Sequence, residues 1–323
     1  MSLKNVLVAV APHVGGRQAG SALGALFPGQ AKVTVVETLD ENPEALREAH
    51  VVLTALVPVT AGHLDAAPAL ELVQCSSHGY EHVDVAAARR HGVPVCTIGS
   101  SDAELHSVAE QTFALMLALA KQLVPAHNAL AGGEWALPRL RGSLTELSGK
   151  TLGIVGLGTI GREVARRAAV FGMSVVYASR TPAAPEVEER LGARRLPLEE
   201  LLRVSDYVSL HASLNDSTRS LLDAGRLALL KPTAFVVNTA RGALIDQDAL
   251  ADALEQGRLA GAGLDVYDPE PPGPGLRLLK APNVVLSPHA GGVTREAVVR
   301  IALAAVRNVT EHLGGGEPLD VVN

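Results

Sequence analysis

Three side chains in the second half of the sequence carry groups that can bind a carboxylate and exchange a proton. Arg241 follows the run FVVNTA, and its planar guanidinium can donate two parallel hydrogen bonds to a carboxylate. His289 ends the run VVLSPH, and Glu270, in YDPEPP, can raise the pKa of a nearby imidazole and orient its ring. Taken singly, His289 could equally be a packing or surface residue, and Glu270 a solvated acid. As a set they suit the reduction of a 2-keto acid, which needs a cation for the carboxylate and a proton for the carbonyl oxygen.

A glycine-rich turn lies upstream of this set, in GIVGLGTIGREV, between a strand-like run and a helical pattern. Its glycines have separate tasks: a tight turn, a close approach of the backbone to a pyrophosphate, and close packing of the helix on the strand. The start of the helix adds free N–H groups and a partial positive charge, which attract phosphates. The alternative is a turn with a purely structural purpose. In this context we expect a dinucleotide site at Gly156, Gly158, Thr159, Ile160 and Gly161.

The strand after that helix ends in YASRT, where many dinucleotide-binding proteins carry an acid that contacts the adenosine ribose. Such an acid accepts a hydrogen bond from the 2′-hydroxyl and repels a 2′-phosphate. Ser179 cannot repel a phosphate, Arg180 can pair with it through two hydrogen bonds, and Thr181 adds a donor. These residues favour NADP(H), with NAD(H) as a second cofactor. The alternative is that Arg180 is a solvated loop residue and that NAD binds with little discrimination.

Short apolar runs alternate with helical patterns along the chain, which is typical of parallel sheets covered by helices. The first series reads NVLVAV, KVTVVE, VVLTAL, LELVQCSS and VPVCTI, with one helix expected at Val85–His91. The second series reads KTLGIVGLG, SVVYAS, YVSLHA, AFVVNTA, GAGLDV and NVVLSPH. We expect a long helix over Ala103–Leu123, a loop over residues 131–149 and a final helix over Thr294–Leu313. The predicted fold class is α/β, with two doubly wound Rossmann-like domains and parallel sheets.

The composition narrows the class of protein. The chain has 323 residues, more than a usual single domain, and is 47% hydrophobic and 19% charged, as in an ordinary globular protein. A net charge of −6 without a long basic run argues against nucleic-acid binding, and no apolar run is long enough to span a membrane. Cys75 and Cys96 lie in strand-like runs and are expected to be buried thiols. These features fit a cytoplasmic protein, and we expect no metal ion in its site.

The sequence resembles the D-2-hydroxyacid dehydrogenase family, and the resemblance covers nearly the whole chain. The stretches that match are GYEHVDV, SVAEQTFALMLALAK, ELSGKTLGIVGLGTIG, NTARGALIDQDALADAL, AGAGLDVYDPEPP and SPHAGG. The stretch GGVTREA resembles members that act on glyoxylate, hydroxypyruvate, or hydroxy acids bearing sulfonate or phosphate. The resemblance implies that Arg241 binds the substrate carboxylate, that His289 is the general acid and base, and that Glu270 is its partner. It also places Ala240 in the cofactor site and assigns Asp265 to the nicotinamide carboxamide.

The family fold implies domains that are not consecutive in the chain. Residues 1–100 with 290–323 would form the substrate domain and 101–289 the dinucleotide-binding domain, with the active site in the cleft between them. Substrate contacts are implied at Leu56, Ser77, His78 and Gly79. His78 departs from many relatives, which carry a small or aliphatic residue there. Its imidazole either adds a contact that favours a second acidic group on the substrate, or it points away and only packs.

The resemblance also implies a homodimer built through the dinucleotide-binding domains, in which the loop GEWALPRLRG approaches the partner's cleft. Trp135 would anchor that interface, and Arg139 or Arg141 either reaches the neighbouring substrate or stays solvated. We therefore expect an NADPH-preferring reductase of small 2-keto acids such as glyoxylate or hydroxypyruvate. Two alternatives stay open: an NAD-dependent enzyme like phosphoglycerate dehydrogenase and, from another class, a dinucleotide-sensing corepressor.

Overall fold

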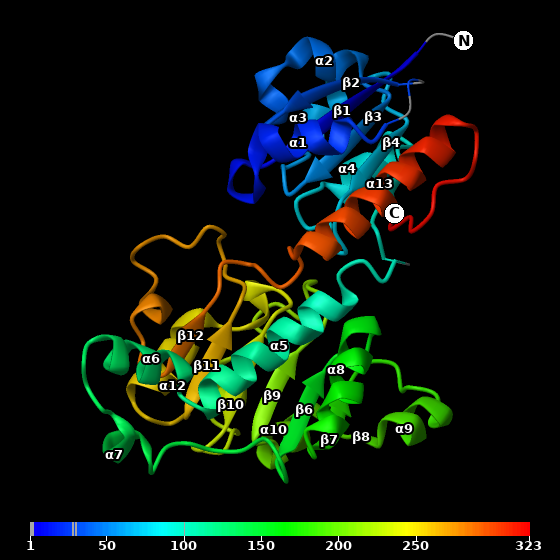
Figure 1. Cartoon of the computed structure of the whole chain (residues 1–323). Coiled ribbons are helices and arrows are strands. Elements are labelled where there is room, and N and C mark those ends of the chain that lie inside the picture. Colours follow the sequence, from blue (N-terminus) through cyan, green and yellow to red (C-terminus); the bar gives the residue numbers. More distant parts are fainter. Residues whose placement is uncertain (1–2, 28, 30, 100) are drawn as a thin grey trace. The chain divides into compact units, whose positions relative to one another are not determined.

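The chain divides into two compact units (Figure 1). The computed structural model describes residues 3–27, 29, 31–99 and 101–323. The first unit consists of Met1–Glu104 and Arg295–Asn323, and the second of Leu105–Thr294. The end of the chain therefore returns to the unit in which the chain begins. Each unit has hydrophobic clusters of its own on both faces of a parallel sheet.

Over the described residues, the first unit forms a five-stranded sheet in the order β2-β1-β3-β4-β5, with every pair parallel. The order is doubly wound, because the chain adds strands on one side of β1 and then on the other. The strands are β1 Lys4–Val10, β2 Ala31–Val36, β3 Val51–Ala55, β4 Leu72–Cys75 and β5 Val95–Cys96. The helices are α1 Gly16–Gly24, α2 Pro43–Glu48, α3 Ala61–Asp65, α4 Val85–Arg90 and α13 Arg295–Leu313, with the 3-10 helices η1 Pro12–Val14 and η2 Leu39–Glu41.

Helices cover both faces of this sheet. Helices α2, α3 and α4 pack on one face, where Leu64 of α3 and Val52 of β3 share a cluster. Helices α1 and α13 pack on the other face, where Val309 of α13 joins Leu53 of β3. Consecutive strand residues thus enter opposite cores, and both must be apolar. This double burial explains why the strands read as continuous apolar runs.

Over the same described residues, the second unit forms a seven-stranded parallel sheet in the order β12-β11-β10-β9-β6-β7-β8. The strand order reverses between β6 and β9, and ligands of such sheets bind at that switch point. The strands are β6 Thr151–Val155, β7 Ser174–Ala178, β8 Ala193–Arg195, β9 Tyr207–Leu210, β10 Phe235–Asn238, β11 Gly261–Leu264 and β12 Val284–Leu286. The helices are α5 Leu105–Ala120, α6 Leu123–Ala131, α7 Leu137–Leu140, α8 Thr159–Val170, α9 Pro185–Leu191, α10 Leu198–Val204, α11 Ala224–Leu227 and α12 Gln247–Glu255, with η3 Gly242–Leu244 and η4 Arg277–Leu279.

The two faces of this sheet are also covered. Helices α5 and α8 lie on one face, where Met116 of α5 packs in a cluster with Ile154 of β6. Helices α10, α11 and α12 lie on the other, where Leu201 of α10 joins Val208 of β9. The predicted α/β class with two doubly wound parallel sheets is confirmed.

Three elements differ from the sequence-based expectation. The helix predicted over Ala103–Leu123 ends at Ala120, because Gln122 takes a left-handed backbone with φ of 47° and α6 starts directly after it. The expected loop over 131–149 contains the short helix α7. Strand β8 was not predicted, because its three residues ARR carry two charges and lack an apolar pattern.

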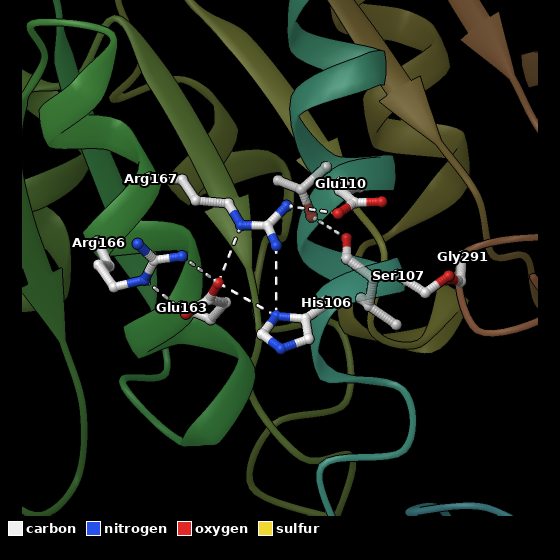
Figure 2. A network of polar contacts seen from close by, with 9 residues as sticks. His106, Ser107, Glu110, Glu163, Arg166, Arg167 and Gly291 are labelled. Atoms are coloured by element: carbon white, nitrogen blue, oxygen red, sulfur yellow. Dashed lines mark hydrogen bonds and ion pairs between the residues drawn. The ribbon is translucent and has the colours of Figure 1, made fainter. Parts of the chain in front are cut away.

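A network of charged side chains joins α5 to α8 (Figure 2). Glu163 of α8 is only 9% exposed, and its carboxylate accepts hydrogen bonds from Arg166 at 2.7 Å and from Arg167 at 3.0 Å. On α5, Glu110 lies 3.2 Å from the guanidinium of Arg167, and Nδ1 of His106 lies 3.3 Å from Glu163. The hydrogen bond from Arg166 holds the pKa of Glu163 down to about 2, against the opposing effect of burial. The first turns of α5 are thereby tied to α8.

The expectation for the cysteines is confirmed. Cys75 and Cys96 are both buried and free. Burial raises the pKa of the Cys75 thiol to about 12, so that it stays protonated. Among the helices of the described residues, none combines the length and the apolar character that crossing a membrane requires.

Candidate active site

Two of the predicted catalytic side chains, His289 and Glu270, form a hydrogen-bonded pair in the second unit. Nδ1 of His289 lies 2.6 Å from Oε2 of Glu270, and the two side chains are 35% and 23% exposed. The other carboxylate oxygen, Oε1, accepts a hydrogen bond from the backbone N–H of Tyr267 at 2.8 Å. Glu270 is thus held at both oxygens, and its bond to Nδ1 turns Nε2 of the imidazole away from the carboxylate.

The pair favours the charged form of both partners. Burial acts to lower the pKa of His289, but the hydrogen bond and charge of Glu270 outweigh it and raise that pKa above its ordinary value. Burial likewise acts to raise the pKa of Glu270, while the bond and charge of His289 bring it below its ordinary value. The positive charge of Arg241 acts to lower both pKa values. The balance of these effects favours a protonated imidazole beside a carboxylate.

Arg241, the third predicted catalytic residue, lies three residues after the end of β10 and directly before η3. The buried side chain of Asn238 fixes this segment: Nδ2 donates to the Arg241 carbonyl at 2.8 Å, and Oδ1 accepts from the Ala240 N–H at 3.0 Å. Nη1 of Arg241 donates to the Ala240 carbonyl at 2.7 Å. Because the charge of Arg241 shifts the pKa of both His289 and Glu270, the structure brings the three residues into electrostatic range of one another.

Asp265 follows β11 and is 1% exposed. Its carboxylate accepts hydrogen bonds from the N–H groups of Ala290 at 2.9 Å and Gly291 at 2.8 Å, and its carbonyl accepts from the His289 N–H at 2.7 Å. Asp265 therefore holds the backbone that carries the imidazole of His289. Its implied contact with the nicotinamide carboxamide stays a prediction.

The backbone at His289 is strained. Its φ of 55° lies in the left-handed region, which costs a residue with a side chain about 1–3 kcal/mol. The segment that follows is fastened on two sides. The hydroxyl of Ser107 on α5 donates to the Gly291 carbonyl (Figure 2), and the Gly291 N–H donates to Oδ2 of Asp265 at 2.8 Å. These contacts hold the backbone beside His289 despite the strain.

The three glycines between β6 and α8 have different surroundings. Gly156 has a φ of 98°, and a Cβ there would lie 2.7 Å from backbone atoms of His211 and Ala212. A Cβ on Gly161 would lie 2.2 Å from the carbonyl oxygen of Gly156, whereas a Cβ on Gly158 would meet nothing within 4 Å. Packing therefore requires the first and third glycines, and Gly158 borders open space at the start of α8. The first turn of α8 carries no acid, so this N-terminus fits a pyrophosphate.

The predicted ribose-contacting residues follow β7. Arg180 and Thr181 are exposed, Ser179 is half-buried, and the Ser179 hydroxyl donates to the Thr181 carbonyl at 2.6 Å. The neighbouring strand β8 brings Arg195 to the same loop, where its Nη2 donates to the Ser179 carbonyl at 3.0 Å. The loop therefore has two guanidinium groups beside it, those of Arg180 and Arg195, and it carries no acid at positions 179–181.

The substrate-contacting residues predicted in the first unit lie at the carboxyl edge of its sheet. Leu56, with φ of 59°, follows β3, and Ser77, His78 and Gly79 follow β4, which pairs with β3. The Ser77 hydroxyl donates to the Gly79 carbonyl at 2.7 Å. Nδ1 of His78 lies 2.8 Å from Oε2 of Glu104. The structure thus gathers these residues as one set, and the predicted catalytic residues of the second unit as another.

Sequence analysis missed several residues that position the site. Besides Asn238, the hydroxyl of Tyr267 donates to the Ser287 carbonyl at 3.0 Å, and the amide of Gln111 donates to the Ser287 hydroxyl at 2.8 Å. Asn238 and Tyr267 had a detectable signal, because each is a polar residue at or just past the end of a buried strand. Gln111 had none, since its partner lies 176 residues away in the chain.

Known proteins share this sequence and fold. The family model described as D-isomer specific 2-hydroxyacid dehydrogenase, NAD binding domain, matches residues 113–291. A glyoxylate reductase of Aeropyrum pernix is 41% identical over 285 residues, which cover 86% of this chain and 84% of that protein. A hydroxypyruvate reductase of Thermotoga maritima is 37% identical over 278 residues, which cover 85% of this chain and 88% of that protein.

The likeness extends to solved structures. A glyoxylate reductase from Paecilomyes thermophila matches with a TM-score of 0.84 and 32% identity, over 100% of this chain and 99% of that chain. The glycine turn, Arg241, Glu270 and His289 all lie within the residues that the family model matches. The chain belongs to the family of D-isomer specific 2-hydroxyacid dehydrogenases and is an NAD(P)-dependent oxidoreductase.

Proposed function

We propose that this dehydrogenase works mainly as a reductase of small 2-keto acids of the glyoxylate and hydroxypyruvate class, with NADPH as its preferred cofactor. The observation that supports the reaction most directly is the hydrogen-bonded pair of His289 and Glu270 with the charge of Arg241 nearby. These groups match the needs of a 2-keto acid, a cation for the carboxylate and a proton donor for the carbonyl oxygen. The names of the relatives from Aeropyrum pernix and Thermotoga maritima support the substrate class.

In the proposed reaction, Arg241 binds the substrate carboxylate and fixes the position of the keto carbon. A bound reduced nicotinamide supplies the hydride. Nε2 of His289 donates its proton to the carbonyl oxygen, and Glu270 keeps the ring oriented and protonated until that transfer. Asn238 and Asp265 hold the backbone segments that carry the guanidinium and the imidazole. In the oxidative direction, a neutral His289 accepts the proton of the hydroxyl group.

The loop after β7 supports the preference for NADPH. Ser179 lacks the negative charge that would repel a 2′-phosphate, and the exposed side chain of Arg180 can pair with it. The contacts predicted from Leu56, Ser77, His78 and Gly79 to the substrate belong to the proposal as well.

We also propose that the enzyme is a homodimer. Support comes from α6, α7 and the segment between them, where four large apolar side chains are each more than half exposed: Leu123, Leu130, Trp135 and Leu137. Such a concentration of apolar surface is typical of a protein interface. Arg139 pairs with Glu134 at 3.2 Å, which favours a solvated role for this arginine over contact with a neighbouring substrate.

Steady-state reduction of glyoxylate and of hydroxypyruvate, each with NADPH and with NADH, tests the proposed function. We expect kcat/KM to be at least about tenfold higher with NADPH, because a hydrogen bond between charged groups contributes about 1.5–3 kcal/mol. Equal or better use of NADH would overturn the cofactor preference. Absence of turnover with both keto acids would overturn the substrate class.

Two substitutions test the catalytic roles. We expect Arg241→Ala and His289→Ala each to lower kcat/KM for glyoxylate by about two to four orders of magnitude, because one removes the carboxylate-binding cation and the other the proton donor. NADPH binding, followed by fluorescence titration, should change little. Arg258→Ala is a matched control, because Arg258 is an exposed arginine of the same unit bonded to Gln256. Turnover like the wild type in either variant would exclude that residue from the catalytic set.

The pH dependence tests the role of Glu270. Reduction needs a protonated His289, so its rate should fall as the pH rises through the raised pKa of that residue. Glu270→Gln removes the charge that raises this pKa, and we expect the alkaline limb of the kcat/KM profile to move to lower pH. Glu255→Gln, which removes an exposed acid paired with Arg277, should leave the limb in place. An alkaline limb unchanged in Glu270→Gln would contradict the assignment.

The oligomeric state tests the proposed dimer. Light scattering of the full chain should give about twice the mass of one chain, and the double substitution Leu130→Asp with Trp135→Asp should lower the mass toward that of a monomer, because charges would then be buried at the interface. Val170→Asp is the control, because Val170 is a highly exposed apolar residue of α8 outside this segment. A monomeric wild type, or a double variant that stays dimeric, would refute the proposal.

A further inference from the structure

Strand β8 brings a second guanidinium to the loop that follows β7. In the register of the two strands, Arg195 lies opposite Tyr177, one residue before the end of β7. Nη2 of Arg195 reaches over the end of β7 and donates to the carbonyl oxygens of Ser179 at 3.0 Å and Arg180 at 3.4 Å. The side chain therefore lies beside the two residues where the sequence places contact with the adenosine ribose.

These two hydrogen bonds change the electrostatics of the loop. The carbonyl oxygens of Ser179 and Arg180 are acceptors with partial negative charge, and acceptors of this kind disfavour an anion nearby. Because Arg195 donates to both carbonyl oxygens, its positive charge offsets their partial negative charge. The loop is held from beneath as well, because the hydroxyl of Tyr177 accepts from the Ala183 N–H at 3.0 Å and donates to Glu188.

Arg195 retains donors for a further acceptor. A guanidinium has five N–H groups, and the described bonds of Arg195 use only Nη2. Its side chain and that of Arg180 are both exposed. A phosphate monoester carries a charge of about −1.5 to −2 at neutral pH, which two arginines balance and one does not.

The side chain of Arg194, the residue before Arg195 in β8, points to the opposite face of the sheet. Arg194 pairs in register with Val176, whose side chain packs in the cluster with Leu201. Tyr177 packs in the cluster on the other face. Because successive side chains of a strand point to opposite faces, Arg194 is directed away from the face on which Arg195 meets the loop.

We propose that Arg195 is a second specificity-determining residue for the cofactor, which holds the carbonyl groups of Ser179 and Arg180 through Nη2 and presents its remaining N–H groups to the 2′-phosphate of NADPH. This inference rests on the proposed preference for NADPH and adds to it a residue outside the glycine motif and outside the loop itself.

Binding of two nucleotide fragments to the full chain tests the proposal without turnover. Adenosine 2′,5′-bisphosphate carries the 2′-phosphate and adenosine 5′-monophosphate lacks it, and isothermal titration gives the Kd of each. We expect the wild type to bind the bisphosphate more tightly. Arg195→Ala should reduce the ratio of the two Kd values about tenfold, since a hydrogen bond between charged groups is lost. Arg194→Ala removes the same charge from the neighbouring position and should leave the ratio unchanged.

The outcomes separate this inference from the proposed cofactor preference. If the wild type binds both fragments equally, the preference for NADPH fails and the role of Arg195 fails with it. If the wild type discriminates and Arg195→Ala discriminates equally well, only the role of Arg195 is overturned. A uniform loss of affinity for both fragments would also overturn it, because that pattern belongs to a residue that merely holds the loop. Circular dichroism of each variant checks that the fold is retained.

Discussion

Parallel strands joined by helical crossovers must all end at the same edge of their sheet, and the arrangement of this molecule depends on that constraint. In the second unit, Arg241, Asp265 and His289 follow β10, β11 and β12, which are adjacent strands. Groups far apart in the sequence are thereby neighbours in space. The glycine turn follows β6 and the loop of Ser179, Arg180 and Thr181 follows β7, on the other side of the point where the strand order reverses. The residues proposed for the chemistry and those proposed for dinucleotide binding therefore lie at one edge of the sheet.

Buried polar side chains fix the conformation of the loops that follow the strands. A strand end fixes where a loop starts, but not where the following side chain points. The side chain of Asn238 makes hydrogen bonds to the backbone of the loop that carries Arg241. The side chain of Asp265 does the same for the loop that carries His289. Both are about 1% exposed, so an unmade bond there would leave a buried polar group unsatisfied, at a cost of about 1–3 kcal/mol. These buried groups fix the geometry of the loops, and the more exposed Arg241 and His289 are the residues proposed to contact the substrate.

The sequence predicts those parts of the fold that depend on local pattern. Continuous apolar runs reveal strands buried on both faces, and GIVGLGTIG marks a turn in which close packing requires a glycine at Gly156 and at Gly161. Strand β8 escapes such analysis, because an edge strand of three residues with two arginines has no apolar pattern. Its side chain at Arg195 was missed with it, although the loop that it contacts was identified from Arg180. The bond between Gln111 and Ser287 was also beyond prediction, since only the tertiary fold brings them together.

At position 289, the residue that would give the most stable backbone differs from the residue that the proposed reaction needs. The left-handed backbone there is one that glycine adopts without strain, whereas histidine adopts it at a cost. The residue that would suit the chain best has no side chain, and the proposed chemistry requires an imidazole. The hydrogen bonds that Asp265 and Ser107 make to Gly291 hold the backbone around position 289, and they help the fold to tolerate the strain of a histidine there. These two residues therefore support the proposed function, although neither contributes a reacting atom in the described structure.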